Sequence, residues 1–147
     1  SGPGAVVTLV MVLLIKFAAL ASILTAGDWT LLLLAPVLGR VALPLLFQTT
    51  AYVRPGGLGS ALAQHLPRRA GIVLVLASVL CVAVAMGRIG VVSLVVAAAM
   101  FLVLRTIMLR RIHGTTGDTA GAMVELIETS VLVTAAVALT ENYPSTF

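Results

Sequence analysis

The residues best suited to chemistry lie near the carboxyl end of the chain, where residues 115–118 read Thr-Thr-Gly-Asp and lead into an apolar run. Asp118, Glu125 and Glu128 provide three of the five acidic residues of the whole chain. A carboxylate at mid-bilayer depth costs about 2.5–3.5 kcal/mol. Such residues persist when they bind a cation, face a polar cavity or pair with a base. We therefore expect the chemistry of this protein in this segment.

The spacing of the three carboxylates places them toward one side of a helix. At about 100° per residue, Asp118 and Glu125 differ by about 20° around the helix axis, and Glu128 differs from Asp118 by about 80°. Carboxylates are the ligands that hard divalent cations prefer, above all Mg²⁺. We predict that Asp118, Glu125 and Glu128 bind Mg²⁺ and that the first two are catalytic. The alternative is that these carboxylates pair with Lys16 or Arg105 of another helix.

Arginines accompany the carboxylates. Arg40, Arg54 and Arg105 are expected near the same membrane face as Asp118. An arginine clamps phosphate oxygens with two parallel hydrogen bonds. The helix start at Thr116 and Gly117 can offer free backbone N–H groups to an anion. Cation ligands and anion donors in one place indicate a site for a polyphosphate substrate.

Composition decides the class of protein that must position these residues. The chain is 61% hydrophobic and 10% charged, with a mean hydropathy of +1.18. Soluble domains carry about 25% charged residues, so a soluble fold is excluded. The nine Lys and Arg residues are spread between apolar runs, and we expect no nucleic-acid partner. The sequence predicts an all-α, polytopic integral membrane protein embedded in a lipid bilayer.

Five transmembrane helices are expected, each near the ~20 residues that cross the hydrocarbon core. Lys16 interrupts the first, and Gly87 with Arg88 forms a tight turn between the third and fourth. We interpret the five spans as parts of a single membrane domain. The predicted spans are residues 5–26, 29–47, 70–86, 89–109 and 118–140.

The distribution of Lys and Arg between loops predicts the orientation. Arg88 alone lies in the loops of one side, and the other side has Arg54, Arg68, Arg69, Arg110 and Arg111. Because basic loops stay in the cytoplasm, we place loops 48–69 and 110–117 inside and the C-terminus outside. The ionisable residues are then expected toward the cytoplasmic face, with four exceptions, which are Lys16, Asp28, Arg88 and Glu141.

Four segments resemble one known family. Residues 109–122, Leu-Arg-Arg-Ile-His-Gly-Thr-Thr-Gly-Asp-Thr-Ala-Gly-Ala, with the glutamates that follow them, resemble the C-terminal signature of the cobalamin synthase (adenosylcobinamide-GDP ribazoletransferase) family. Residues 51–59, Ala-Tyr-Val-Arg-Pro-Gly-Gly-Leu-Gly, look like its tyrosine-x-arginine loop. Gly39 and Arg40 look like its small-residue-plus-arginine pair. The glycine segment before a helix with a central lysine, here Lys16, also matches.

The resemblance implies a reaction at the inner (cytoplasmic) membrane, with the active site facing the cytoplasm. The family transfers phospho-adenosylcobinamide from its GDP-activated form to α-ribazole or α-ribazole phosphate, releases GMP and uses Mg²⁺. Tyr52 joins Arg54 as a predicted substrate-binding residue. A second copy of the chain and other cobalamin-pathway enzymes are further candidate partners. The family's motif Asp-Gly-x-x-Asp-x-x-Asp does not occur in the 147 residues. Either residues 1–147 are the C-terminal transmembrane part of a single, longer membrane domain, with the motif upstream of Ser1, or the metal site is incomplete.

Two other functions remain open at this point. A membrane transporter or channel subunit would use buried carboxylates to couple to a cation. Against it, the carboxylates are expected near one face, and no internal repeat is visible. A CDP-alcohol phosphotransferase would also combine membrane helices, aspartates and Mg²⁺, but its multi-aspartate signature is missing from these residues.

Overall fold

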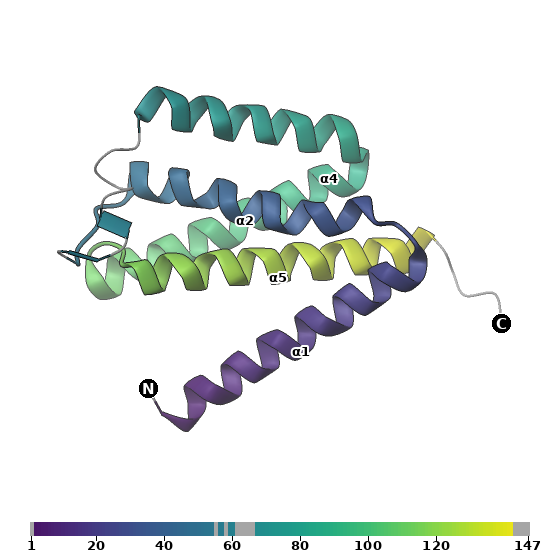
Figure 1. The fold of residues 1–147 in the computed structure, drawn as a ribbon, viewed down its shortest axis with the longest axis horizontal. Helices are drawn as coiled ribbons and strands as arrows, with labels where there is room; N and C mark the ends of the chain where they lie inside the picture. Colours follow the sequence, from purple (N-terminus) through teal and green to yellow (C-terminus); the bar gives the residue numbers. More distant parts are fainter. Residues whose placement is uncertain (1, 55, 58, 61–66, 143–147) are drawn as a thin grey trace.

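Long apolar helices account for nearly all of the computed structural model, which describes residues 2–54, 56–57, 59–60 and 67–142. All four helices of the described residues are long and apolar enough to cross a membrane. Figure 1 shows them as a bundle with one diverging member. The prediction of an all-α, polytopic membrane protein is confirmed. The helices are α1 (Pro3–Ala26), α2 (Thr30–Thr49), α4 (Arg68–Ile112) and α5 (Gly117–Asn142).

The third and fourth predicted spans are the two arms of α4. A straight helix of its 45 residues would be about 67 Å long, more than twice the ~30 Å hydrocarbon core. Gly87 breaks it with a φ of 52° and a ψ of −131°, a conformation that only glycine adopts readily. The chain then turns back on itself (Figure 1). A Cβ on Gly90 would lie 2.7 Å from the Cβ of Met86, so the tight turn also needs a glycine there.

Helix α5 is the centre of the bundle, because its apolar side chains repeat at the helical spacing that keeps one face inward. Met123, Ile127, Val131 and Ala135 follow one another at intervals of four residues and are essentially inaccessible. Helix α2 buries a similar stripe and contains two prolines, Pro36 and Pro44, without ending. Both prolines lie inside the predicted second span, as expected.

Helix α1 is attached to the bundle only through its second half. It begins with a proline in its first turn and ends at Gly27, whose φ of 76° stops the helix. Ala19 and Ile23 are its buried residues, whereas large apolar side chains of its first half are exposed, as at Val7, Leu9 and Leu14. In Figure 1 this first half runs away from the other helices.

Candidate functional site

Two loop segments, one after α2 and one before α5, form the candidate site at one end of the bundle. The N–H of Val53 donates to the carbonyl of Thr115 (2.9 Å), and the N–H of Thr115 donates to the carbonyl of Ala51 (2.8 Å). Tyr52 and Thr115 are thereby paired as in a parallel sheet. Thr115 is fully buried. This pairing fixes the loop that carries Arg54 against the start of α5.

The pairing brings together two residues that the sequence analysis predicted separately. The Nη1 atom of Arg54 lies 3.0 Å from Oδ2 of Asp118. The side chains are 62% and 86% exposed, and an exposed ion pair of this kind contributes only about 0.2–1 kcal/mol to stability. Both groups are therefore accessible to a ligand, and a phosphate could replace Asp118 on Arg54 at little energetic cost.

Thr116 caps the first turn of α5. The N–H of Thr119 donates to Oγ1 of Thr116 (3.3 Å), and the N–H of Thr116 donates to Oγ1 of Thr119 (2.9 Å), so the two threonines cap each other. The N–H of Ala120 donates to the carbonyl of Thr116 (2.9 Å). Within the described part of the chain, the amides of Gly117 and Asp118 have no acceptor and remain able to bind an anion.

Tyr52 holds the glycine loop in place. Its ring packs edge-on against Phe47, with 6.1 Å between the ring centroids. A Cβ on Gly59 would lie 2.8 Å from Cε2 of Tyr52, and one on Gly117 would lie 3.6 Å from its hydroxyl oxygen. The ring thus lies between the glycine loop and the start of α5, and only glycine allows this approach at position 59. Pro55 and Leu58 of the same motif are outside the described residues.

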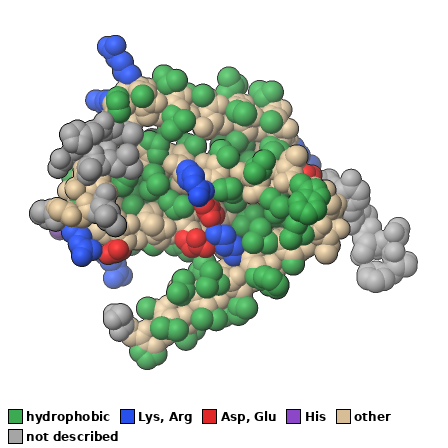
Figure 2. Space-filling view, viewed as in Figure 1, with side chains coloured by type: hydrophobic (Ala, Val, Ile, Leu, Met, Phe, Trp, Pro, Cys, Tyr) green, Lys and Arg blue, Asp and Glu red, His purple; other side chains and the backbone are tan. Residues whose placement is uncertain are grey.

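The other two predicted metal ligands are in a separate group. Nζ of Lys16 lies 2.8 Å from Oε1 of Glu125 and 2.8 Å from Oε2 of Glu128, and Nη1 of Arg40 lies 3.5 Å from Oε1 of Glu128. We call these four residues the α1–α2–α5 charge cluster. Figure 2 shows acidic and basic side chains gathered in the middle of the bundle. The cluster balances two positive and two negative charges.

The location of this cluster differs from the expectation that Arg40, Glu125 and Glu128 lie toward one membrane face. Glu125 and Glu128 follow the start of α5 by about 12 and 17 Å, near the middle of a ~30 Å hydrocarbon core. A basic partner at that depth offsets part of the cost of placing a carboxylate there. The alternative of pairing with Lys16 is thus confirmed for both glutamates.

A glycine makes room for the cluster. A Cβ on Gly39 would lie 2.7 Å from Cγ of Glu128 and 3.2 Å from Cγ1 of Val124. The small residue that precedes Arg40 therefore has a packing role: it lets α5 bring Glu128 close to α2. Gly121, by contrast, has no atom within 4 Å of such a Cβ and is exposed. The face of α5 that carries Asp118 and Gly121 is thus open.

Arg105 belongs to neither carboxylate group. Its Nε donates to Oγ1 of Thr49 (3.3 Å) and of Thr50 (3.1 Å), and its Nη2 donates to the carbonyl of Thr49 (2.7 Å). These bonds tie the second arm of α4 to the end of α2. The alternative of pairing Arg105 with Asp118, Glu125 or Glu128 is not observed among the described ion pairs.

The donor set at Asp118 fits a magnesium ion that keeps most of its water. The described residues contain no group of three or more His, Cys, Asp or Glu side chains that could hold a metal by themselves. Mg²⁺ is commonly bound by one or two carboxylates together with substrate phosphates. Asp118, exposed beside Arg54, would provide one such carboxylate. The predicted metal ligation by Glu125 and Glu128 stays a prediction, and both carboxylates are bound to Lys16 in this structure.

The fold and the site define a polytopic membrane protein. At one end of its bundle, which we call the loop end, the guanidinium of Arg54 and the carboxylate of Asp118 lie together. The profile of the cobalamin-5-phosphate synthase family matches residues 1–136, and the chain belongs to this family. It is 57% identical over 133 residues to the adenosylcobinamide-GDP ribazoletransferase of Pseudomonas paraeruginosa, covering 90% of this chain and 54% of that protein.

A second relative gives the same result. The protein of the same name from Pseudomonas fluorescens is 54% identical over 134 residues, which cover 90% of this chain and 55% of the relative. The chain therefore spans about half the length of these curated relatives. No solved structure matches it. Nothing in the family or in these relatives favours a transporter or channel subunit.

Proposed function

We propose that this chain provides the diphosphate-binding face of an adenosylcobinamide-GDP ribazoletransferase. The reaction is the transfer of phospho-adenosylcobinamide from its GDP-activated form to α-ribazole or α-ribazole phosphate, with release of GMP. The observation that carries the proposal is the contact between Arg54 and Asp118, 64 positions apart in sequence and 3.0 Å apart in space. Family membership and the names of the relatives support the choice of substrate.

Two kinds of donor at the loop end can bind a diphosphate, namely a guanidinium and backbone amides. The guanidinium of Arg54 has five N–H donors, and its contact with Asp118 uses only Nη1. The other donors can clamp phosphate oxygens, and the amides of Gly117 and Asp118 can bind the same anion at the start of α5. The loop pairing fixes Arg54 relative to this helix start, so the diphosphate is oriented before reaction.

Asp118 would hold the Mg²⁺ that the diphosphate brings to this site. When bound, Mg²⁺ would neutralise charge on the phosphate oxygens. Thr116 and Thr119 keep the first turn of α5 rigid beneath Asp118. The expectations that Arg40 and Arg105 also contact the diphosphate stay predictions, because Arg40 lies with Glu128 and Arg105 with Thr49.

We further propose that this face is cytoplasmic and that the membrane is the inner membrane. Nucleotides do not cross a bilayer unaided, and the basic loops lie at the same end as Arg54 and Asp118. The wider partners, namely a second copy of the chain and other cobalamin-pathway enzymes, remain expectations, as does the assignment of residues 1–147 to the C-terminal part of one membrane domain.

Substitution of Arg54 tests the diphosphate contact. Lysine keeps the charge but not the planar fork, so Arg54→Lys should markedly raise the KM for the GDP-activated corrinoid. The KM is measured in membranes from cells that produce the protein. Arg88→Lys is the matched control, because Arg88 is exposed at the opposite end of the bundle. If Arg54→Lys and Arg54→Ala both bind and convert the substrate normally, Arg54 only determines topology and the proposal is wrong.

A further inference from the structure

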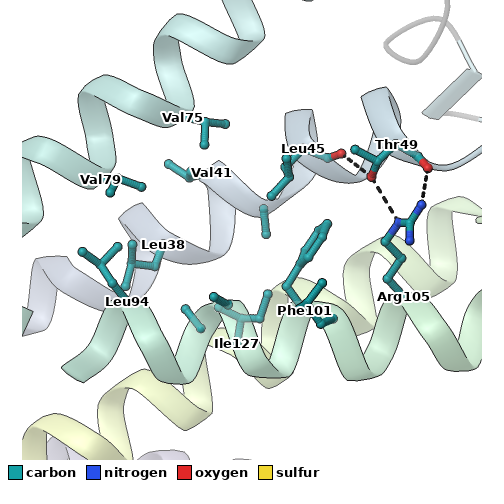
Figure 3. Close-up of a pocket in the computed structure, with 14 residues that line it drawn as sticks. Leu38, Val41, Leu45, Thr49, Val75, Val79, Leu94, Phe101, Arg105 and Ile127 are labelled. Atoms are coloured by element: carbon teal, nitrogen blue, oxygen red, sulfur yellow. Dashed lines mark hydrogen bonds between the residues drawn. The ribbon is translucent and has the colours of Figure 1, made fainter. Parts of the chain in front are cut away.

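A cavity of about 540 Å³ lies between α2 and the two arms of α4 and reaches α5 at Ile127 (Figure 3). All of its fourteen lining residues except Thr49 and Arg105 are apolar. In Figure 3 these two polar residues lie together at one end, and the side chains of Leu38 and Leu94 lie toward the other. We call this cavity the α2–α4 groove. It is separate from the Arg54–Asp118 contact, which none of its lining residues provides.

The length of the groove matches one leaflet of a bilayer. Eleven positions separate Leu38 from Thr49 on α2 and Leu94 from Arg105 on α4, which is about 16 Å along each helix. Half of the hydrocarbon core is about 15 Å. The polar end of the groove lies toward the loop end of the bundle, near the level of lipid headgroups, and its apolar end reaches the depth of the bilayer centre.

Part of the groove lining is exposed on the outer surface of the described helices. Leu102 and Val79, which both line it, are 59% and 39% exposed. A molecule could therefore enter from the side without passing through the loop end. An apolar chain in the groove would fill space that α2 and α4 leave uncovered and would make van der Waals contacts with its apolar lining.

Arg105 gives the polar end a net positive charge. Its contacts with Thr49 and Thr50 are all to neutral oxygens, and no acidic side chain forms an ion pair with it in the described part of the chain. Nη1 is left without a hydrogen-bond acceptor among the same residues. A phosphate is the anion whose geometry suits the guanidinium fork.

We propose that the α2–α4 groove takes one acyl chain of an anionic phospholipid, whose headgroup phosphate lies on Arg105. The apolar walls, the length of one leaflet, the lateral opening and the uncompensated charge support this occupant together. The proposal does not depend on the transfer reaction, and it gives Arg105 a role other than contact with the diphosphate of a substrate.

Fluorescence quenching by brominated lipids tests the proposal. The only tryptophan, Trp29, is replaced by phenylalanine, and a reporter is introduced as Phe101→Trp inside the groove. The matched control reporter is Val103→Trp, two residues away at nearly the same depth, 55% exposed and outside the lining. Two kinds of vesicle are compared, and both consist mainly of unlabelled phosphatidylcholine. One contains a minor share of phosphatidylglycerol with brominated acyl chains, and the other contains the same share of phosphatidylcholine with brominated acyl chains.

We expect brominated phosphatidylglycerol to quench the groove reporter severalfold more than brominated phosphatidylcholine does. The control reporter should be quenched equally by the two lipids. Arg105→Gln should remove the preference, and Ala98→Phe, which narrows the groove without touching Arg105, should weaken quenching by both lipids. Equal quenching of the groove reporter by both lipids, or a preference that survives Arg105→Gln, would overturn the proposal. So would release of the quenching by GDP, which would make the groove a nucleotide site.

Discussion

Lys16 of α1 and Glu128 of α5 are 112 positions apart in the sequence, yet their Nζ and Oε2 atoms lie 2.8 Å apart in the middle of the bundle. Their side chains are only 20% and 13% exposed, so this ion pair lies largely within the protein. The first half of α1 has no buried residue, so the pair, the buried residues Ala19 and Ile23, and the partly buried Leu20 hold α1 to the bundle.

Removal of the lysine should therefore destabilise the protein. Lys16→Met leaves two carboxylates with a single basic partner, Arg40, and we expect the free energy of unfolding to fall by about 1–3 kcal/mol. The double variant Lys16→Met/Glu125→Gln removes one charge of each sign and should recover most of the loss. Thermal unfolding in detergent micelles measures both. If the single variant unfolds at the wild-type temperature, the cluster does not hold α1.

The close approach of Glu128 to Gly39 gives a second prediction. A Cβ at position 39 would lie 2.7 Å from Cγ of Glu128, so Gly39→Ala should push α2 and α5 apart and cost about 1–3 kcal/mol. Gly121→Ala is the matched control, since it makes the same change in an open part of α5 and should stabilise the helix slightly. Equal unfolding temperatures for the two variants would show that Gly39 is not needed for packing.

The cap of α5 gives a third prediction. Thr116→Ala removes the oxygen that accepts the N–H of Thr119 and should cost about 1 kcal/mol. In the control variant, Thr106→Ala, the lost hydroxyl only donates to the carbonyl of Leu102 within an exposed part of α4, and we expect a change near zero. Chemical unfolding of the two variants compares them directly, and a similar loss in both would argue against the cap.

Much of this arrangement could be predicted from the sequence, because it depends on local patterns. The apolar runs gave the spans to within a few residues, and Gly87 was expected at the turn that divides α4. The pairing of Ala51 and Val53 with Thr115 could not be predicted, because it is a single bridge between distant loops without a strand pattern. The contact between Arg54 and Asp118 depends on that bridge.

The ion-pair partners of the carboxylates also could not be predicted from local sequence patterns. Spacing placed Asp118 and Glu125 on one face of a helix, but which helix faces them depends on how α1 and α2 pack against α5. Lys16 was one of two candidate partners, and only the structure distinguishes it from Arg105. The mutual cap of Thr116 and Thr119 was missed, although two threonines spaced as in a capping box are a readable signal.

Labelling with a membrane-impermeant thiol reagent tests the proposed orientation. Single cysteines replace Ser60, in the loop after α2, and Glu141, in the last turn of α5, in a Cys81→Ser background. In intact cells we expect Glu141→Cys to be labelled and Ser60→Cys to be protected, because the basic loops should be cytoplasmic. The reverse pattern would place Arg54 and Asp118 outside and exclude a reaction on cytoplasmic nucleotides.

The most direct measurement of the central claim is the Mg²⁺ dependence of the transfer reaction in membranes with Asp118→Asn. Asparagine keeps the size and loses the charge, so we expect normal expression but a rate lower by at least about 10–100-fold, the loss that even outer-shell partners of a metal cause. Glu141→Gln, a similar change at the far end of α5, should leave the rate unchanged. Near-normal turnover of Asp118→Asn at saturating Mg²⁺ would contradict the account.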